Sequence, residues 1–275
     1  MRHVICHYHI FKNSGTSFDE VLTDTVGSRL VSFDGPFPFS VFDQDELLKV
    51  IRNHGAARAF SSHQIRLPVP VSLEVRILPV VFLRHPLLRI RSVYEFFCQR
   101  ADQKQGLRRM LPGAARPGFT SRDEASSKKL DFAGWLREAV DGSRPLNNIS
   151  NAQTQLLCGA YGRRGLMRVV PLADGGVIAD IDQARRNLCA VELLARTEHF
   201  TADVARFAAP LADCGIEFTQ RDRKPANTTS NDIFRPLEAR LAALREQIGD
   251  ALYSDLEMLN RQDLQLYDEV CKRLG

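Results

Sequence analysis

The sequence lacks several features that would assign it to a class at once. No apolar run approaches the roughly 18–20 residues needed to span a bilayer. The 37 basic and 33 acidic side chains give a net charge of only +4, which is too weak on its own to indicate nucleic-acid binding. The six cysteines are scattered without a C-x-x-C pair, so zinc-site spacing is absent. We therefore expect no nucleic-acid partner and no membrane span. The cysteines are expected to be isolated buried thiols in a reducing compartment.

The totals describe an ordinary globular protein. With 275 residues, 44% hydrophobic and 25% charged, the chain is long enough for one large domain, and we find no internal repeat. We expect a single domain over 1–275. Structured residues are expected from about His3, which leaves no room for a signal peptide. The prediction is a cytoplasmic enzyme or binding protein, and the sequence leaves its oligomeric state open.

Apolar patterning alternates between strand and helix. Strands are predicted at 3–11, 28–33, 57–63, 75–85 and 190–198. Helices are predicted at 15–26, 43–54, 86–97, 130–141, 147–158, 180–189, 198–213 and from 234 to the end. Because Pro79 lacks an N–H, pairing of the fourth strand is expected to begin at about Val80. The pattern predicts an α/β fold with a mainly parallel sheet flanked by helices and a helical C-terminal half.

Three stretches carry predictions about packing and exposure. Residues 100–129 hold eight Lys/Arg against three Asp/Glu. We predict a long exposed loop that cradles an anionic or polyhydroxyl acceptor, lies peripherally on a membrane, or is merely solvated. Trp135 is predicted to be core. The apolar residues of the last region are predicted to be core rather than a dimer face; they are Leu241, Leu244, Ile248, Leu252, Leu256 and Leu259.

The turn after the first strand, KNSGTS at 12–17, has the composition of a phosphate site. A strand-to-helix turn presents free backbone N–H groups at the positive end of the helix dipole. Gly15 permits close approach, the hydroxyls add donors, and Lys12 adds a cation. The loop is not a Walker A motif, because the lysine precedes the glycine, and no acidic strand end supplies a magnesium ligand. The alternative is that Ser14 or Thr16 only caps the helix.

A second anion site is predicted after the fourth strand. Arg84 stands at the strand end, Pro86 opens the helix, and Ser92 lies about two turns along. Carboxyl ends of parallel strands meet at one edge of a sheet, so this loop should converge with the first. The alternative is that Arg84, Arg89 and Arg91 are ordinary surface charges.

HIFKNSGTSF followed by FLRHPLLRIRSVY resembles the two cofactor motifs of the carbohydrate sulfotransferases, including the heparan sulfate 2-O-sulfotransferases. NAQTQLLCG (151–159), IDQARRNLCAVELLARTEHF and RKPANTTS resemble further segments of that family. The resemblance implies a nucleotide-kinase-like P-loop fold that binds the sulfuryl donor 3′-phosphoadenosine 5′-phosphosulfate (PAPS), with 3′-phosphoadenosine 5′-phosphate (PAP) as product. Phe11, Asn13 and His85 replace the usual Pro, Thr and Asp of these motifs.

The same resemblance implies the site residues. The 5′-phosphosulfate would lie on Lys12, Asn13, Ser14, Gly15, Thr16 and Ser17, and the 3′-phosphate on Arg84 and Ser92. A loop at 219–232 would close over the cofactor with Lys224, Asn227 and Thr228.

Sulfuryl transfer needs a cation at the leaving oxygen and a base for the acceptor hydroxyl. Lys12 suits the first role. His63, at the end of the third strand, matches the placement of the family's histidine base, and His54 and His85 are its rivals. The expected acceptor is a saccharide or glycolipid hydroxyl.

No metal is expected. His7 and His9 share a strand face, but no Asp, Glu or Cys of suitable spacing joins them, so they are predicted to be core or rim histidines. The competing functions are a phosphoryl-transfer kinase that uses the same loop, and a nucleotide- or glycan-binding protein without turnover.

Overall fold

The computed structural model describes residues 1–35, 40–110, 126–127, 129–142, 148–159, 170–171, 177–221 and 235–275. The predicted fold class is confirmed in its coarse form. A five-stranded sheet has the order β2-β3-β1-β4-β7, and every pair in it is parallel. Its strands are β1 (Arg2–Tyr8), β2 (Leu30–Ser32), β3 (Ala59–Ser62), β4 (Val75–Leu83) and β7 (Leu193–Arg196). A separate antiparallel pair consists of β5 (Val170–Pro171) and β6 (Val177–Ile178).

Helices cover both faces of the sheet. One apolar core lies between the sheet and α1 (Gly15–Val26), α8 (Phe200–Ala205) and α9 (Ala208–Asp213). The opposite core involves α2 (Gln44–Asn53), α6 (Ala152–Leu157), α7 (Ile181–Cys189) and α12 (Arg261–Leu274). Short 3-10 turns, η1 (Gly27–Arg29) and η2 (Thr197–His199), complete the connections. Burial on both faces explains why β4 is a nearly continuous apolar run.

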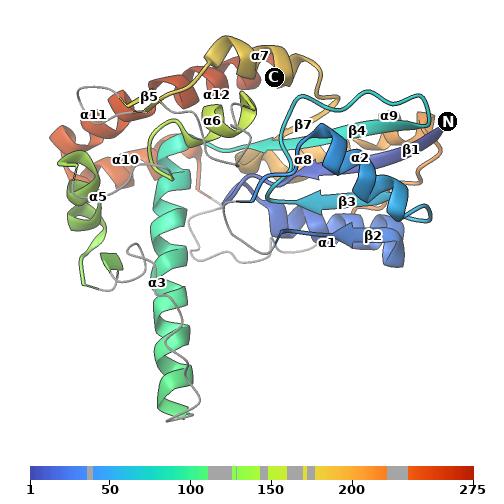
Figure 1. The fold of residues 1–275 in the computed structure, drawn as a ribbon. Coiled ribbons are helices and arrows are strands. Elements are labelled where there is room, and N and C mark those ends of the chain that lie inside the picture. Colours follow the sequence, from blue (N-terminus) through green and yellow to red (C-terminus); the bar gives the residue numbers. More distant parts are fainter. Residues whose placement is uncertain are drawn as a thin grey trace.

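A third core contains no strand. It is formed by α3 (Pro86–Met110), α5 (Phe132–Val140), α10 (Leu237–Ile248) and α11 (Asp250–Leu259). These helices lie beyond the carboxyl ends of the strands, and α3 projects away from the rest of the molecule (Figure 1). Trp135 is buried in this core, as predicted.

Several predicted boundaries were wrong, each for a local reason. The helix from Pro86 continues to Met110, so 100–110 is not a loop; its residues are mostly good helix formers, and the next proline is Pro112. Residues 111–125 and 128 of that predicted loop lie outside the described residues. The predicted C-terminal helix is three helices, interrupted at Gly249, where φ is 82°, and at Asn260.

Other differences concern β4 and the shorter helices. Pairing of β4 with β1 begins at Val75, earlier than predicted, whereas its pairing with β7 begins at Val80, after the proline. The predicted helix 147–158 is confined to α6, because Asn151 is in the left-handed region with φ 44°. The predicted helix 198–213 is divided into η2, α8 and α9.

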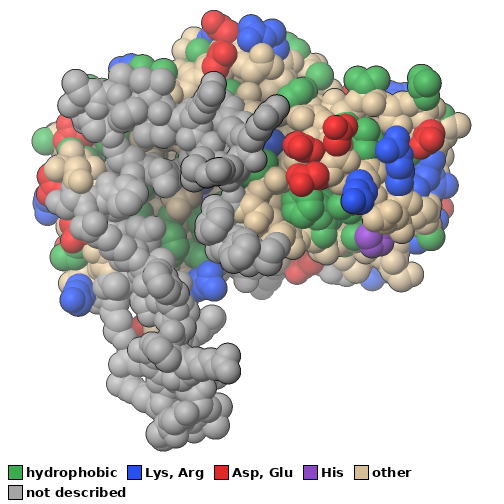
Figure 2. Space-filling model, in the orientation of Figure 1, with side chains coloured by type: hydrophobic (Ala, Val, Ile, Leu, Met, Phe, Trp, Pro, Cys, Tyr) green, Lys and Arg blue, Asp and Glu red, His purple; other side chains and the backbone are tan. Residues whose placement is uncertain are grey.

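None of the described helices is both long and apolar enough to cross a membrane. All six cysteines are free. Cys6, Cys158 and Cys214 are buried as predicted, but Cys98 and Cys271 are half-buried and Cys189 is exposed. On the face in Figure 2, the described acidic and basic side chains are interspersed.

The leucines of α10 and α11 pack in the third core, which contains no strand, as predicted. Leu256 of α11 is fully buried, whereas its neighbour Met258 is 51% exposed. We expect Leu256→Ala to lower the free energy of unfolding by about 2–5 kcal/mol, because it leaves a cavity. Met258→Ala should change it by less than about 0.5 kcal/mol. Urea denaturation of both variants checks this, and equal small losses would contradict the assignment of this face to the core.

Candidate active site

The strand order indicates where a ligand would bind at the carboxyl edge of the sheet. After β1 the chain crosses toward β2, and after β4 it crosses toward β7 on the other side. Ligands of open α/β sheets bind at such a divergence. The loop that follows β1 and the loop that follows β4 meet at this divergence, as the sequence predicted.

The loop after β1 has an unusual backbone conformation, and no side chain caps the start of α1. Lys12 and Ser14 are both in the left-handed region, with φ of 66° and 60°. Each such non-glycine residue costs about 1–3 kcal/mol and is typical of functional sites. Ser14 is the N-cap of α1 but makes no capping hydrogen bond with its side chain. The side chain of Ser14 therefore satisfies none of the first-turn N–H groups of α1, contrary to the capping alternative for Ser14. Its backbone oxygen accepts from the N–H of Phe18 at 3.0 Å, the first regular bond of the helix.

Lys12 has no carboxylate of the described residues within ion-pair distance. Its Nζ lies 5.1 Å from the ring centroid of Phe96 on α3. Burial, followed by the charge of Arg84, lowers the pKa of Lys12. A cation held in this way is available to an anion.

Asn13 does not offer the donor that the sequence suggested. It is 1% exposed, and its Nδ2 donates to Phe82 O and to Gln153 Oε1, both at 2.7 Å. Its backbone N–H donates to Ile10 O at 3.2 Å. All its N–H donors are thus used within the protein, and Asn13 ties the loop to β4 and α6.

Position 15 must be glycine because the side chain of His9 leaves no room for a Cβ there, whether or not a ligand binds. A Cβ at this position would lie 1.7 Å from His9 Nε2. The imidazole of His9 therefore occupies the space into which a side chain at position 15 would project. Of the three hydroxyl residues, Ser17 is buried, Ser14 is half-buried and Thr16 is exposed.

The second loop is bound to the first through arginines. Arg84 Nη1 donates to Lys12 O at 3.1 Å, and Arg89 Nε donates to Phe11 O at 3.1 Å. Arg89 is 1% exposed and burial lowers its pKa to about 10, so it is not a surface charge. Only Arg91, which pairs with Glu95, fits that alternative. Ser92 is buried on α3.

Glu198 supplies the carboxylate that His85 removes from the motif. Glu198 Oε1 accepts a hydrogen bond from the backbone N–H of His85 at 3.2 Å and lies 3.9 Å from Arg84 Nε. Tyr267 donates to its other oxygen at 2.9 Å. The acidic residue that orders this loop therefore comes from the segment after β7.

Gln153 joins the two loops and was not singled out from the sequence. Its Oε1 accepts from Asn13 and from the backbone N–H of Arg84 at 3.0 Å, and its Nε2 donates to Arg84 O at 2.9 Å. Asp263 of α12 accepts from the backbone N–H groups of Gln153 and Thr154. The available signal was the polar NAQTQ run at a helix start.

His63 lies at the carboxyl end of β3 with an exposed side chain. Its Nδ1 is 3.1 Å from His9 O. A carbonyl only accepts, so Nδ1 carries the proton and Nε2 keeps its lone pair. Partial burial, followed by His9, lowers the pKa of His63. Asp34 accepts from the backbone N–H of His63 and from Ser62 Oγ, which fixes this segment.

The rival bases are poorly placed. The backbone oxygen of His54 accepts from Arg2, at the amino end of β1, so His54 lies at the opposite edge of the sheet. His85 is 8% exposed, and burial, followed by Arg240 and Arg84, lowers its pKa to about 4.

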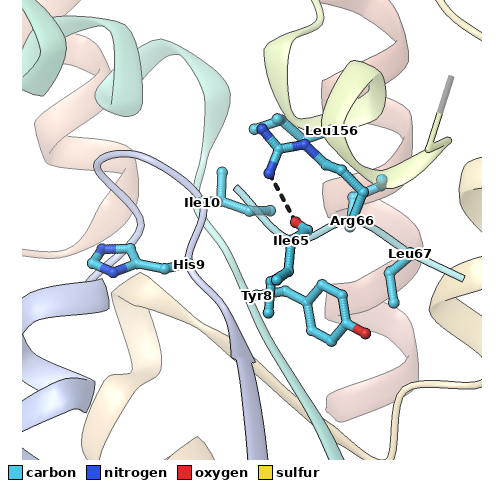
Figure 3. A pocket seen from close by; sticks show the side chains of 8 residues that line it. Tyr8, His9, Ile10, Ile65, Arg66, Leu67 and Leu156 are labelled. Atoms are coloured by element: carbon cyan, nitrogen blue, oxygen red, sulfur yellow. Dashed lines mark hydrogen bonds between the residues drawn. The ribbon is translucent and has the colours of Figure 1, made fainter. Parts of the chain in front are cut away.

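A small pocket is formed by residues around the carboxyl ends of β1 and β3 and by α6, with His9 in its lining. Tyr8, Ile65, Leu67 and Arg66 line it, and Figure 3 shows His9 turned away from Tyr8. Arg66 Nη1 donates to His63 O and to Ile65 O. The pocket therefore adjoins the backbone of the candidate base.

Two other predictions concern residues near or beyond this edge. Lys224, Asn227 and Thr228 lie outside the described residues, as does 222–232 of the predicted closing loop. The premise that no acidic residue joins His7 and His9 was wrong, because α1 brings Asp19 against both imidazoles.

The comparisons with known proteins do not indicate an activity for this chain. No family model matches the chain. An uncharacterised protein of Archaeoglobus fulgidus is 26% identical over 272 residues, which cover 98% of this chain and 96% of that one.

The contact between Gly15 and His9 yields a direct test. We expect Gly15→Ala to lower the free energy of unfolding by about 1–3 kcal/mol, because the new methyl group overlaps the imidazole. Gly55→Ala is the matched control, since a Cβ there meets nothing within 4 Å. Urea denaturation of the two variants measures the difference; equal stability would mean that His9 does not occupy this space.

Proposed function

We propose that the protein is a sulfotransferase that moves the sulfuryl group of PAPS to a hydroxyl of an acceptor, with a saccharide as the acceptor class. One observation carries the proposal. The uncapped start of α1 with Lys12, the Arg84 loop and His63 follow three neighbouring strands, β1, β4 and β3, at one edge of the sheet.

The residues at this edge fit the cofactor. First-turn N–H groups and Lys12 suit the 5′-phosphosulfate. Arg84 and Ser92 remain the candidates for the 3′-phosphate. Arg84 is held by Lys12 O and Glu198 and is 15% exposed. Ser92 is buried on α3, 7% exposed. When bound, PAPS supplies an activated sulfuryl group.

Each side chain then has a chemical task. Lys12 neutralises the charge that develops on the leaving phosphate oxygen. His63 Nε2 accepts the proton of the acceptor hydroxyl as the oxygen attacks sulfur. His9 cannot take this role, because its Nε2 faces Gly15. The proposed transfer uses no metal.

Selective stabilisation tests the cofactor. PAP at about 100 times its Kd should stabilise the fold by about 2.7 kcal/mol, which raises Tm by several degrees. Lys12→Ala should lose most of this rise, because the cation is removed while the described contacts of the loop persist. Lys49→Ala, an exposed lysine on α2, should keep it. Differential scanning fluorimetry with PAP and with ATP–magnesium gives the answer.

The outcomes separate the competing functions. Stabilisation by ATP–magnesium alone would replace the sulfotransferase with a phosphoryl-transfer kinase. Arg84→Ala tests the 3′-phosphate contact. In this variant PAP should stabilise the fold no more than adenosine 5′-phosphate does. Circular dichroism must first establish that it folds, since Arg84 also bonds Lys12 O.

Turnover tests the base. His63→Ala should reduce release of PAP from PAPS, with a panel of saccharide acceptors, by about 10²–10⁴-fold, and should leave PAP binding intact. His54→Ala is the control. The base must be neutral, and the pKa of His63 is lowered from the usual histidine value. The wild-type rate should therefore stay constant down to about pH 6.5 and fall only at lower pH, where His63 becomes protonated. PAP binding without turnover in the wild type would favour a binding protein.

A further inference from the structure

Two imidazoles and one carboxylate converge beside the first turns of α1. His7 and His9 share one face of β1, and their rings are nearly parallel, 4.9 Å apart at 15°. Asp19 of α1 faces both. His7 Nδ1 lies 2.9 Å from Asp19 Oδ1, and His9 Nδ1 lies 3.5 Å from Asp19 Oδ2.

The packing around these groups fixes their direction. Phe18 meets the His7 ring edge-on at a centroid distance of 5.0 Å, and Gly15 lies against His9 on its Nε2 side. Both Nδ1 atoms are therefore turned toward Asp19. The side chain of His7 is 1% exposed, that of His9 is 10%, and that of Asp19 is 26%, so the cluster is reached from the side of Asp19.

The distances approach those of a coordination shell. The three candidate ligand atoms all lie within 4.8 Å of one another. Bonds of about 2.1 Å in a tetrahedral zinc site separate ligand atoms by about 3.4 Å. The largest separation exceeds the tetrahedral one by about 1.4 Å, a difference that small side-chain rotations would close. Imidazole with carboxylate is a donor set used for zinc and other first-row transition ions.

We propose that His7, His9 and Asp19 bind one divalent transition ion of the zinc class, with a water molecule in the fourth position on the exposed side. The site uses neither Lys12 nor Arg84, and it does not depend on the proposed sulfuryl transfer. The competing explanation is a carboxylate that only accepts hydrogen bonds from two imidazoles.

Cobalt and zinc binding to the untagged chain test the proposal. After chelator treatment, the wild type should bind about one Zn²⁺ per chain in equilibrium dialysis and give a visible Co²⁺ d–d band, as three protein ligands require. Asp19→Asn and His9→Asn should each weaken binding by at least about 10–100-fold, the loss that even an outer-shell change causes. His54→Asn, at the opposite edge of the sheet, should bind like the wild type.

Two results would overturn the proposal. One is a wild type whose dialysis compartment holds no more Zn²⁺ than the protein-free compartment. The other is binding that persists unchanged in both Asp19→Asn and His9→Asn, with their folding verified by circular dichroism. PAP stabilisation of the chelated wild type is measured in parallel. It reports on the proposed function alone, so either hypothesis can fail without the other.

Discussion

The candidate site depends on the buried amide of Gln153. It is 1% exposed and bonds Asn13 in the loop after β1 and both backbone groups of Arg84 in the loop after β4. A buried amide left with unmade bonds costs about 1–3 kcal/mol, so this network holds the two loops in one arrangement. The left-handed conformations of Lys12 and Ser14 persist because the loop around them is fixed in this way.

Charge at this edge is balanced by residues from distant segments. Arg89 has no described carboxylate within ion-pair distance and is satisfied by carbonyl oxygens, Phe11 O and Asn148 O. Arg84 shares Glu198 with His85 and Tyr267. Asp19 lies between two imidazoles; burial acts to raise the pKa of Asp19, but hydrogen bonds from His7 and His9 hold it below its usual range. Lys12 differs from these groups, because no carboxylate of the described residues lies within ion-pair distance of it and Glu95 acts on it only at longer range.

Local signals in the sequence were enough to predict the sheet, α1 and the convergence of the two loops. These signals are all short-range: the alternation of apolar and polar residues, Gly15 at the start of α1, and Pro86 at the start of α3. The roles of Gln153, Glu198 and Asp19 could not be predicted, since each depends on a tertiary contact that no spacing encodes. Asn13 was misassigned for the same reason: an amide in a loop can donate to a ligand or to Phe82 O, and only the packing decides. The length of α3 was missed because charge, together with the glycines and prolines of 100–129, was taken as evidence for a loop over the whole segment.

The bonds from Asp263 to Gln153 and Thr154 join residues about 110 positions apart. Such contacts form only after a long loop closes, at an entropic cost that slows folding. During synthesis, strands β1 to β4 emerge well before α12 exists. The two loops at the carboxyl edge therefore acquire their final support only when α12 has left the ribosome. A chain that stops before α12 would contain every residue of the loop after β1 and lack the carboxylate that anchors α6 beside it.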